Sequence, residues 1–172
     1  MTGSKRSRPA LTKAGRGAAA CILLASAFAG GQQAQAAEPR RADAAQAATP
    51  VGTVAAFHAA LTAGNKAAAL ALLTEDVLIF ESGGVERGRA EYSRHHLEAD
   101  AAFSAAVQRT LVSRTHDEKA DNAWVTSVEK VSGSYRGRAV NNRSLETMLL
   151  RRINGSWRIT HVHWSSSTKP AG

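Results

Sequence analysis

Residues 146–165, which read ETMLLRRINGSWRITHVHWS, decide the fold. Apolar, β-branched and aromatic runs flank Asn154-Gly155, and this dipeptide between such runs is a strong signal of a β-hairpin. Two further runs of the same kind precede the hairpin and are separated from it by polar breaks. We therefore predict a four-stranded antiparallel meander over residues 107–116, 123–135, 144–153 and 156–166.

The residues before the meander alternate between helical and extended patterns. Val54, Phe57 and Leu61 recur at helical spacing, in a helix that enters at Pro50 and stops at Gly64-Asn65. A short helix over 66–73, a strand over 77–81 with a return over 85–88, and a helix over 89–103 are predicted to follow. Three N-terminal helices on one face of a curved, mainly antiparallel sheet make an α+β cone with one open end.

The first 36 residues have the parts of a cleavable signal peptide. The basic segment has no acidic residue, the apolar run over 18–29 is too short to cross a bilayer, and Ala34-Gln35-Ala36 offers the small-x-small cleavage pattern. We predict cleavage after Ala36, with Ala37 as the second choice, and a periplasmic or secreted protein. Residues 37–49 are predicted to be a flexible leader, 50–167 the folded domain, and 168–172 a disordered tail.

Cleavage changes what the composition implies. The whole chain has 22 basic and 14 acidic residues and a pI near 10.4, values that suggest nucleic-acid binding. Five basic residues lie in the predicted signal, which leaves 17 basic against 14 acidic residues, a net charge of +3, and no basic run. Cys21 is the only cysteine and leaves with the signal, so neither a disulfide nor thiol chemistry is expected. We expect no nucleic-acid partner and, after cleavage, no membrane anchor.

The closing hairpin also resembles a known superfamily. Residues 146–152 (ETMLLRR), Asn154-Gly155 and residues 157–165 (WRITHVHWS) are similar to the last hairpin of the nuclear transport factor 2-like (NTF2-like) superfamily, and within it to the SnoaL-like and DUF4440 group. They are also similar to the association domain of calcium/calmodulin-dependent kinase II. Support comes from Phe80-Glu81, Val85-Glu86-x-Gly88 and Tyr92, and the resemblance covers about residues 50–167. It implies a cone-shaped NTF2-like fold.

This resemblance leaves the function open. The superfamily includes ketosteroid isomerase-like enzymes, polyketide cyclases and dehydratases, and it also includes ligand-binding or oligomerising members without catalysis. The kinase association domain lines its pocket with arginines, whereas the matching positions here are Glu129, Met148 and Trp164. The same anionic ligand is therefore not expected, and the acidic pair of ketosteroid isomerases is not recognisable.

Two groups of residues are candidates for chemistry. Tyr92 and His96, with His95 adjacent, are four apart on the predicted helix, so a phenol and an imidazole would project into the cone as an acid/base pair or would close the core. Glu129 and Glu146 are carboxylates in otherwise apolar strands. Facing inward, they would have pKa values raised by desolvation; facing solvent, or paired with arginine or lysine, they would be structural.

The face that carries His161-x-His163 depends on the hairpin register. A two-residue turn pairs Ile153 with Ser156, which sets Glu146 opposite His163 and Met148 opposite His161. A three-residue loop with Gly155 in a bulge shifts the pairing by one and moves Glu146 to the face of Val162 and Trp164, which leaves the histidines at a dimer seam. The resemblance favours the second register.

We predict a protein whose conical pocket binds a small, partly apolar molecule, with no cofactor and no metal, and which forms a homodimer through its sheet. The expected ligand-binding residues are Tyr92, His96, Glu129, Met148, His161, His163 and Trp164. The alternatives are an acid/base isomerase, cyclase or dehydratase that uses His96, Glu129 or Glu146, and a non-catalytic oligomerisation module. A zinc site formed by His96, His161 and His163 is a further hypothesis, although the sequence contains no cluster of possible ligands beyond His161-x-His163.

Overall fold

The computed structural model describes residues 48–168. The predicted signal peptide, the leader up to residue 47 and the tail after residue 168 lie outside this part of the chain, while Thr168 is the last residue of a strand. The elements are α2 (Pro50–Thr62), α3 (Lys66–Ala71), β1 (Leu73–Glu81), β2 (Gly84–Arg87), α4 (Arg89–His95), α5 (Leu97–Ala106), β3 (Val107–Lys119), β4 (Asn122–Tyr135), β5 (Arg138–Ile153) and β6 (Ser156–Thr168).

Both ends of helix α2 are set by local sequence. The Thr49 side chain accepts a hydrogen bond from the Gly52 backbone at 3.0 Å, and Pro50 occupies the first turn, where its missing N–H costs nothing. At the other end Gly64 has a φ of 67°, and the Asn65 N–H donates to the Ala60 carbonyl at 2.8 Å. This left-handed ending satisfies the last carbonyls and confirms the predicted stop at Gly64-Asn65.

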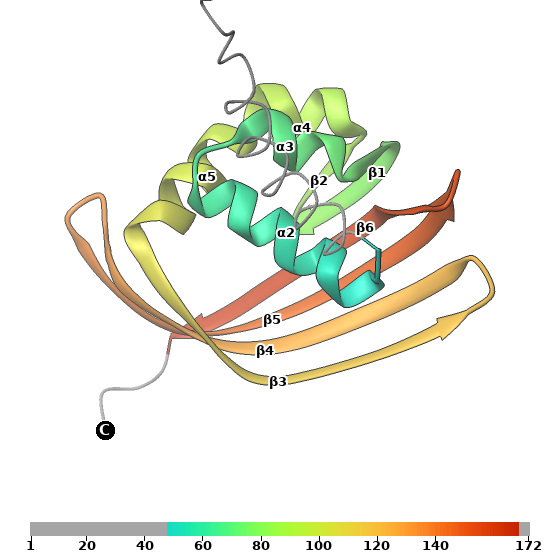
Figure 1. Ribbon diagram of the computed structural model, residues 1–172. Helices are drawn as coiled ribbons and strands as arrows, with labels where there is room; N and C mark the ends of the chain where they lie inside the picture. Colours follow the sequence, from blue (N-terminus) through green and yellow to red (C-terminus); the bar gives the residue numbers. More distant parts are fainter. Residues whose placement is uncertain (1–47, 169–172) are drawn as a thin grey trace, which may run out of the picture.

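The strands form one curved sheet in the order β2-β1-β6-β5-β4-β3. The meander from β3 to β6 is antiparallel throughout, as predicted, and β1 joins its free edge in parallel with β6. All four helices lie on the concave face of this sheet (Figure 1). The α+β cone predicted from the sequence is therefore confirmed.

The closing hairpin combines features of both predicted registers. Asn154 and Gly155 have φ values of 50° and 78°, and Ile153 pairs with Ser156 across this two-residue turn. A bulge follows, in which Leu149 pairs with His161 although Leu150 pairs with Ile159, so Thr160 is the extra residue. Beyond the bulge the pairing is shifted by one, and Glu146 lies opposite Trp164 on the concave face. The predicted shift is confirmed, but a bulge within β6 causes it rather than a longer loop.

The single helix predicted over 89–103 is wrong. The chain bends at His96, where φ is −102°, and this bend separates α4 from α5. Tyr92 stays buried beneath α4, whereas the His96 side chain is 60% exposed. The spacing of four residues therefore does not bring these two side chains into one pocket.

The core lies between α2 and the concave face of the sheet. Val54, Phe57 and Leu61 of α2 are buried, and so are the inward-facing residues of the sheet, among them Val125, Met148, Leu150, Ile159 and Val162. Each such side chain contributes roughly 1.5–3 kcal/mol through burial. Within residues 48–168, no helix is long and apolar enough to span a membrane.

Candidate functional site

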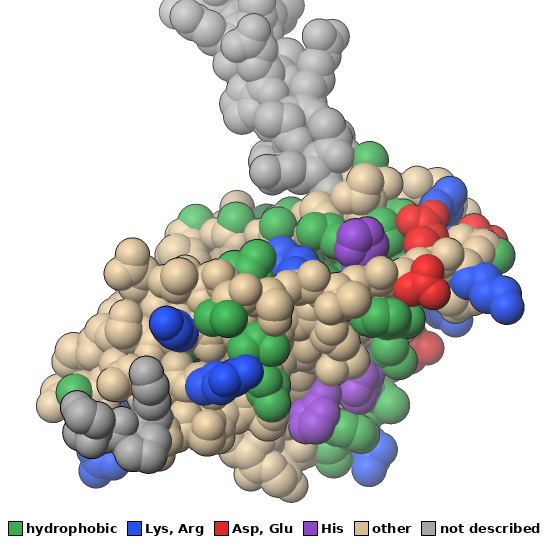
Figure 2. All heavy atoms as spheres, turned by 90° about the horizontal axis from the view of Figure 1, so that it is seen from below, with side chains coloured by type: hydrophobic (Ala, Val, Ile, Leu, Met, Phe, Trp, Pro, Cys, Tyr) green, Lys and Arg blue, Asp and Glu red, His purple; other side chains and the backbone are tan. Residues whose placement is uncertain are grey.

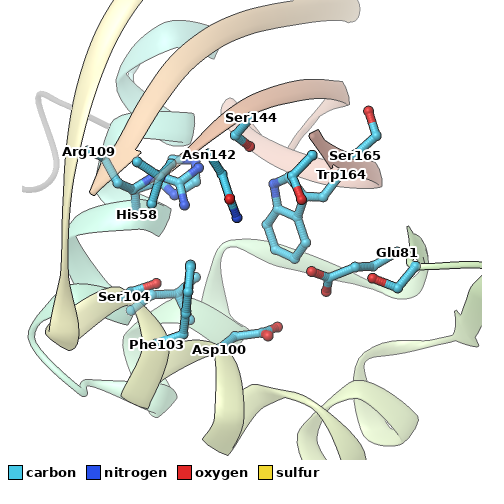
Figure 3. Close-up of a pocket in the computed structure, with 14 residues that line it drawn as sticks. His58, Glu81, Asp100, Phe103, Ser104, Arg109, Asn142, Ser144, Trp164 and Ser165 are labelled. Atoms are coloured by element: carbon cyan, nitrogen blue, oxygen red, sulfur yellow. The ribbon is translucent and has the colours of Figure 1, made fainter. Parts of the chain in front are cut away.

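A pocket opens between α2, α5 and the concave face of the sheet (Figure 3). Its cavity volume is about 110 Å³, and it opens to solvent at one end. Leu61, Phe103 and Val131 give it apolar walls, while Trp164 projects toward its centre. The remaining lining residues are polar: His58, Glu81, Ser82, Asp100, Ser104, Arg109, Asn142, Ser144, Ser165 and Ser166.

His58 and Glu146 form a buried hydrogen-bonded pair at the inner wall. Glu146 faces inward with Met148 and Leu150 through the regular alternation of β5, and the bulge in β6 places Trp164 on the same face. The Glu146 Oε2 lies 2.6 Å from His58 Nε2 and accepts from Trp164 Nε1 at 2.8 Å. Ser127 donates to the other oxygen at 3.3 Å. Burial alone would raise the pKa of Glu146, but the His58 charge and the hydrogen bonds from His58 and Trp164 outweigh it and lower the pKa to about 2. This carboxylate stays ionised and fixes the His58 ring at the pocket wall.

Arg109 reaches the pocket from β3 and is held by Glu129. The Arg109 Nε donates to Glu129 Oε2 at 2.7 Å, and its Nη2 lies 2.6 Å from the same oxygen. Although it is buried, Nη2 has no hydrogen-bond acceptor in good geometry among the described residues. The Arg109 charge therefore neutralises Glu129 behind the pocket wall.

Two acidic groups line the opposite side of the pocket. Asp100, on α5, accepts a hydrogen bond from the buried Tyr92 hydroxyl at 2.9 Å. Burial raises the pKa of Asp100 and, together with Asp100, raises the pKa of Tyr92. Glu81, at the end of β1, also has a raised pKa, first through burial of its carboxyl and then through repulsion by Asp100. Both side chains are therefore easier to protonate than ordinary carboxyls.

A second histidine–carboxylate pair lies outside this pocket. His96 Nδ1 is 2.6 Å from Oε1 of the buried Glu86. This hydrogen bond is the main reason that the pKa of His96 is raised. The pair joins the bend between α4 and α5 to β2, so its evident contribution is to the local structure.

The structure places most of the residues predicted from the sequence around the pocket rather than in it. Trp164 lines it, while Glu146, Glu129 and Tyr92 lie one layer behind and hold His58, Arg109 and Asp100. The expected rise in the pKa of Glu146 is wrong, because its partners outweigh desolvation. Met148 belongs to the core, and His96 is at the surface.

His161 and His163 point away from the pocket, on the convex face of the sheet. They follow the bulge in β6, and the His161 ring meets Phe80 edge-on at 5.0 Å. His96 lies on the other side of the sheet, so the three histidines do not converge. Within residues 48–168, no group of three or more His, Cys, Asp or Glu side chains is placed to hold a metal ion.

The sequence reasoning missed four of the residues that line the pocket. They lie far apart in the chain: His58 is on α2, Glu81 at the end of β1, Asp100 on α5 and Arg109 on β3. His58 stands beside Phe57 in a helical pattern, and Asp100 is four residues after His96, so each resembled an ordinary surface polar residue. What distinguishes His58, Arg109 and Asp100 is the carboxylate or phenol one layer behind, to which each is hydrogen-bonded.

The fold agrees with what the chain is similar to. A SnoaL-like domain matches residues 52–169, and the chain belongs to this family. A candidate ketosteroid isomerase from Shewanella frigidimarina is 37% identical over 67% of this chain and 93% of its own, with a TM-score of 0.64. No protein of curated function has a matching sequence.

Two more distant structures share the fold. A candidate dehydratase of the NTF2-like family from Streptomyces avermitilis is 22% identical over 68% of this chain and 92% of its own, with a TM-score of 0.59. A candidate calcium/calmodulin-dependent protein kinase II association domain from Xanthomonas campestris is 21% identical over 72% of this chain and 91% of its own, with a TM-score of 0.57. At these identities the likeness concerns the fold alone.

Proposed function

We propose that the protein binds a small, partly apolar molecule in the pocket between α2, α5 and the sheet. The observation that carries this proposal is an open cavity with apolar walls on which side chains of opposite charge converge. Trp164 offers a large apolar surface there, and Arg109, Asn142 and Asp100 offer donors and acceptors. If side chains filled the cavity instead, the protein would be better explained as a non-catalytic oligomerisation module.

Native mass spectrometry of the purified protein tests this proposal. We expect a bound small molecule, which should be lost when Ser166→Trp fills the pocket mouth. Ser167→Trp is the matched control, because the next residue of the same strand faces away from the pocket. Retention of the same ligand by Ser166→Trp would refute binding at this site.

Acid/base catalysis is the second candidate, and the His58–Glu146 pair favours it. A buried carboxylate that orients an imidazole is the arrangement by which enzymes hold a general base, and carboxyls with raised pKa values are suitable proton donors. We therefore propose that His58 removes a proton and that Asp100 or Glu81 returns one, as in an isomerase, cyclase or dehydratase.

Hydrogen exchange into the bound ligand would reveal this chemistry. In D₂O the wild-type protein should incorporate deuterium at a carbon of the retained ligand, and His58→Gln should abolish the incorporation. His95→Gln, at an exposed position on α4, should leave it unchanged. Equal incorporation in wild type and His58→Gln would refute a base at His58.

We also propose that two copies associate through the convex face of the sheet. Phe80, Trp124, Leu145 and Leu149 are exposed there, and Figure 2, which views the protein from the side of the sheet, shows hydrophobic and histidine side chains next to one another. Acidic Asp117 flanks this surface at one end. Basic Lys130 and Arg143 flank the other end, and the exposed apolar side chains between the two ends are the surface that a second copy would cover.

Light scattering after size exclusion tests this association. The wild type should have the mass of a dimer, and Leu149→Glu should have that of a monomer, while Thr62→Glu at the end of α2 should stay dimeric. A monomeric wild type would refute the proposal.

Export is proposed on the N-terminal sequence alone. Protein recovered from the periplasm should begin at Ala37, as measured by intact mass. A full-length chain retained in the cytosol would refute both export and the cleavage site.

A further inference from the structure

Negative charge in the pocket is not balanced by the positive charge around it. Arg109 is already paired with Glu129, and His58 with Glu146. Within residues 48–168 no lysine, arginine or histidine forms an ion pair with Glu81 or Asp100, and the hydrogen-bond partner of Asp100 is the neutral Tyr92 hydroxyl. The two carboxyls are therefore the unpaired charges of this cavity.

We propose that the ligand is a small organic amine whose ammonium group binds between Glu81 and Asp100. This inference rests on the proposed ligand-binding function and specifies the class of ligand. Figure 3 shows the carboxyl groups of both residues turned toward one another at one side of the cavity. An ammonium group donates three hydrogen bonds and accepts none, so it suits two carboxyl groups that have no ion-pair partner among the described residues, Asp100 accepting it beside the hydrogen bond from Tyr92.

The pocket walls fit the rest of such a molecule. Trp164 and Phe103 line the same cavity, and aromatic faces attract organic cations. Across the cavity, Arg109 lines the wall with its guanidinium group, which is held by Glu129. The ligand would then carry the amine at one end, a short carbon skeleton along Leu61 and Val131, and a hydroxyl or carbonyl oxygen at the Arg109 end.

The titration of the two carboxyls agrees with this arrangement. Burial raises the pKa of both carboxyls, repulsion by Asp100 adds to the rise at Glu81 and repulsion by Glu86 adds to that at Asp100. A bound cation would lower both pKa values again. Amine binding should therefore release protons and should weaken as the pH falls. A neutral alcohol should show neither effect.

A series of four-carbon probes tests the inference by NMR titration. Butylamine, 1-butanol and butyrate share one skeleton and differ in charge, and 4-amino-1-butanol adds the oxygen proposed to meet Arg109. Butylamine should bind at least about tenfold more tightly than 1-butanol, the effect of roughly one well-placed charge pair. Butyrate should bind most weakly, and 4-amino-1-butanol most tightly.

The outcomes separate this inference from the proposed function. If 1-butanol or butyrate shifts the pocket resonances as strongly as butylamine, the pocket binds ligands but the amine assignment is overturned. If none of the four probes binds, and no ligand is retained in native mass spectra, both proposals fail.

Two variants locate the ammonium group. Glu81→Gln and Asp100→Asn keep the shape of each side chain and remove its charge, and each should weaken butylamine binding about tenfold while 1-butanol binding stays the same. Glu98→Gln is the control, because Glu98 lies on α5 like Asp100, pairs with Lys66 and is largely exposed. Unchanged butylamine affinity in the Glu81→Gln/Asp100→Asn double variant, with an unchanged melting temperature, would overturn the proposal.

Discussion

Glu146→Gln should remove a pH-dependent part of the stability of the fold. The pKa of Glu146 falls from an ordinary 4.5 to about 2 because its ionised form is held by His58 and Trp164. A group with a lowered pKa in the folded state stabilises the protein above its unfolded pKa, and this contribution is lost as the pH falls toward the folded value. A shift of this size corresponds to about 3 kcal/mol, of which about 2 kcal/mol should be lost by pH 3.

The assay is urea unfolding of wild type and Glu146→Gln between pH 6 and pH 3. The difference between their free energies of unfolding should be largest at pH 6 and should shrink by about 2 kcal/mol at pH 3, since the other titrating groups are common to both. Glu75→Gln, at a surface carboxylate paired with Arg89 at 3.4 Å, should change the stability by less than about 1 kcal/mol at every pH. A difference that stays constant with pH would refute the assigned role of Glu146.

Three further predictions concern the core, the bend at His96 and the sheet. Met148→Ala should cost about 2–5 kcal/mol in urea unfolding because its side chain is fully buried, while Leu145→Ala on the convex face of the same strand should cost far less. Glu86→Gln should move the NMR titration midpoint of His96 down toward 6.5, since the Glu86 hydrogen bond is the main cause of its raised pKa; an unmoved midpoint would contradict that cause. Gly133→Ala should lower the melting temperature more than Gly137→Ala, because both glycines have positive φ but only at Gly133 would a new Cβ lie 2.8 Å from the Ala106 carbonyl oxygen.

The fold was predictable because its signals are local. Asn154-Gly155 between apolar strands, Pro50 at a helix start and Gly64 at a helix end each act through their own backbone preferences. The bend at His96 was not predictable, because the residues around it keep helical spacing and a contact with Glu86 on β2 accompanies the break.

The candidate site was harder to predict than the fold. Glu146 and Trp164 were recognised as unusual within their strands, yet their partner His58 lies 88 residues before Glu146. Which face Trp164 occupies, and so whether it meets Glu146, depends on a single extra residue, Thr160, whose effect is visible only in the pairing of two strands. Sequence patterns indicate which residues alternate along a strand, but a one-residue bulge exchanges the two faces beyond it.

The position of β6 between β1 and β5 has a consequence for how the chain is made. Among the described strands, β6 comes last in the chain, and it joins the β1-β2 hairpin to the rest of the sheet. A nascent chain that ends before residue 156 can form the α2 helix and the β3–β5 meander, but it has nothing to connect the two ends of the sheet. The six-stranded sheet can therefore close only after residues 156–168 have been synthesised.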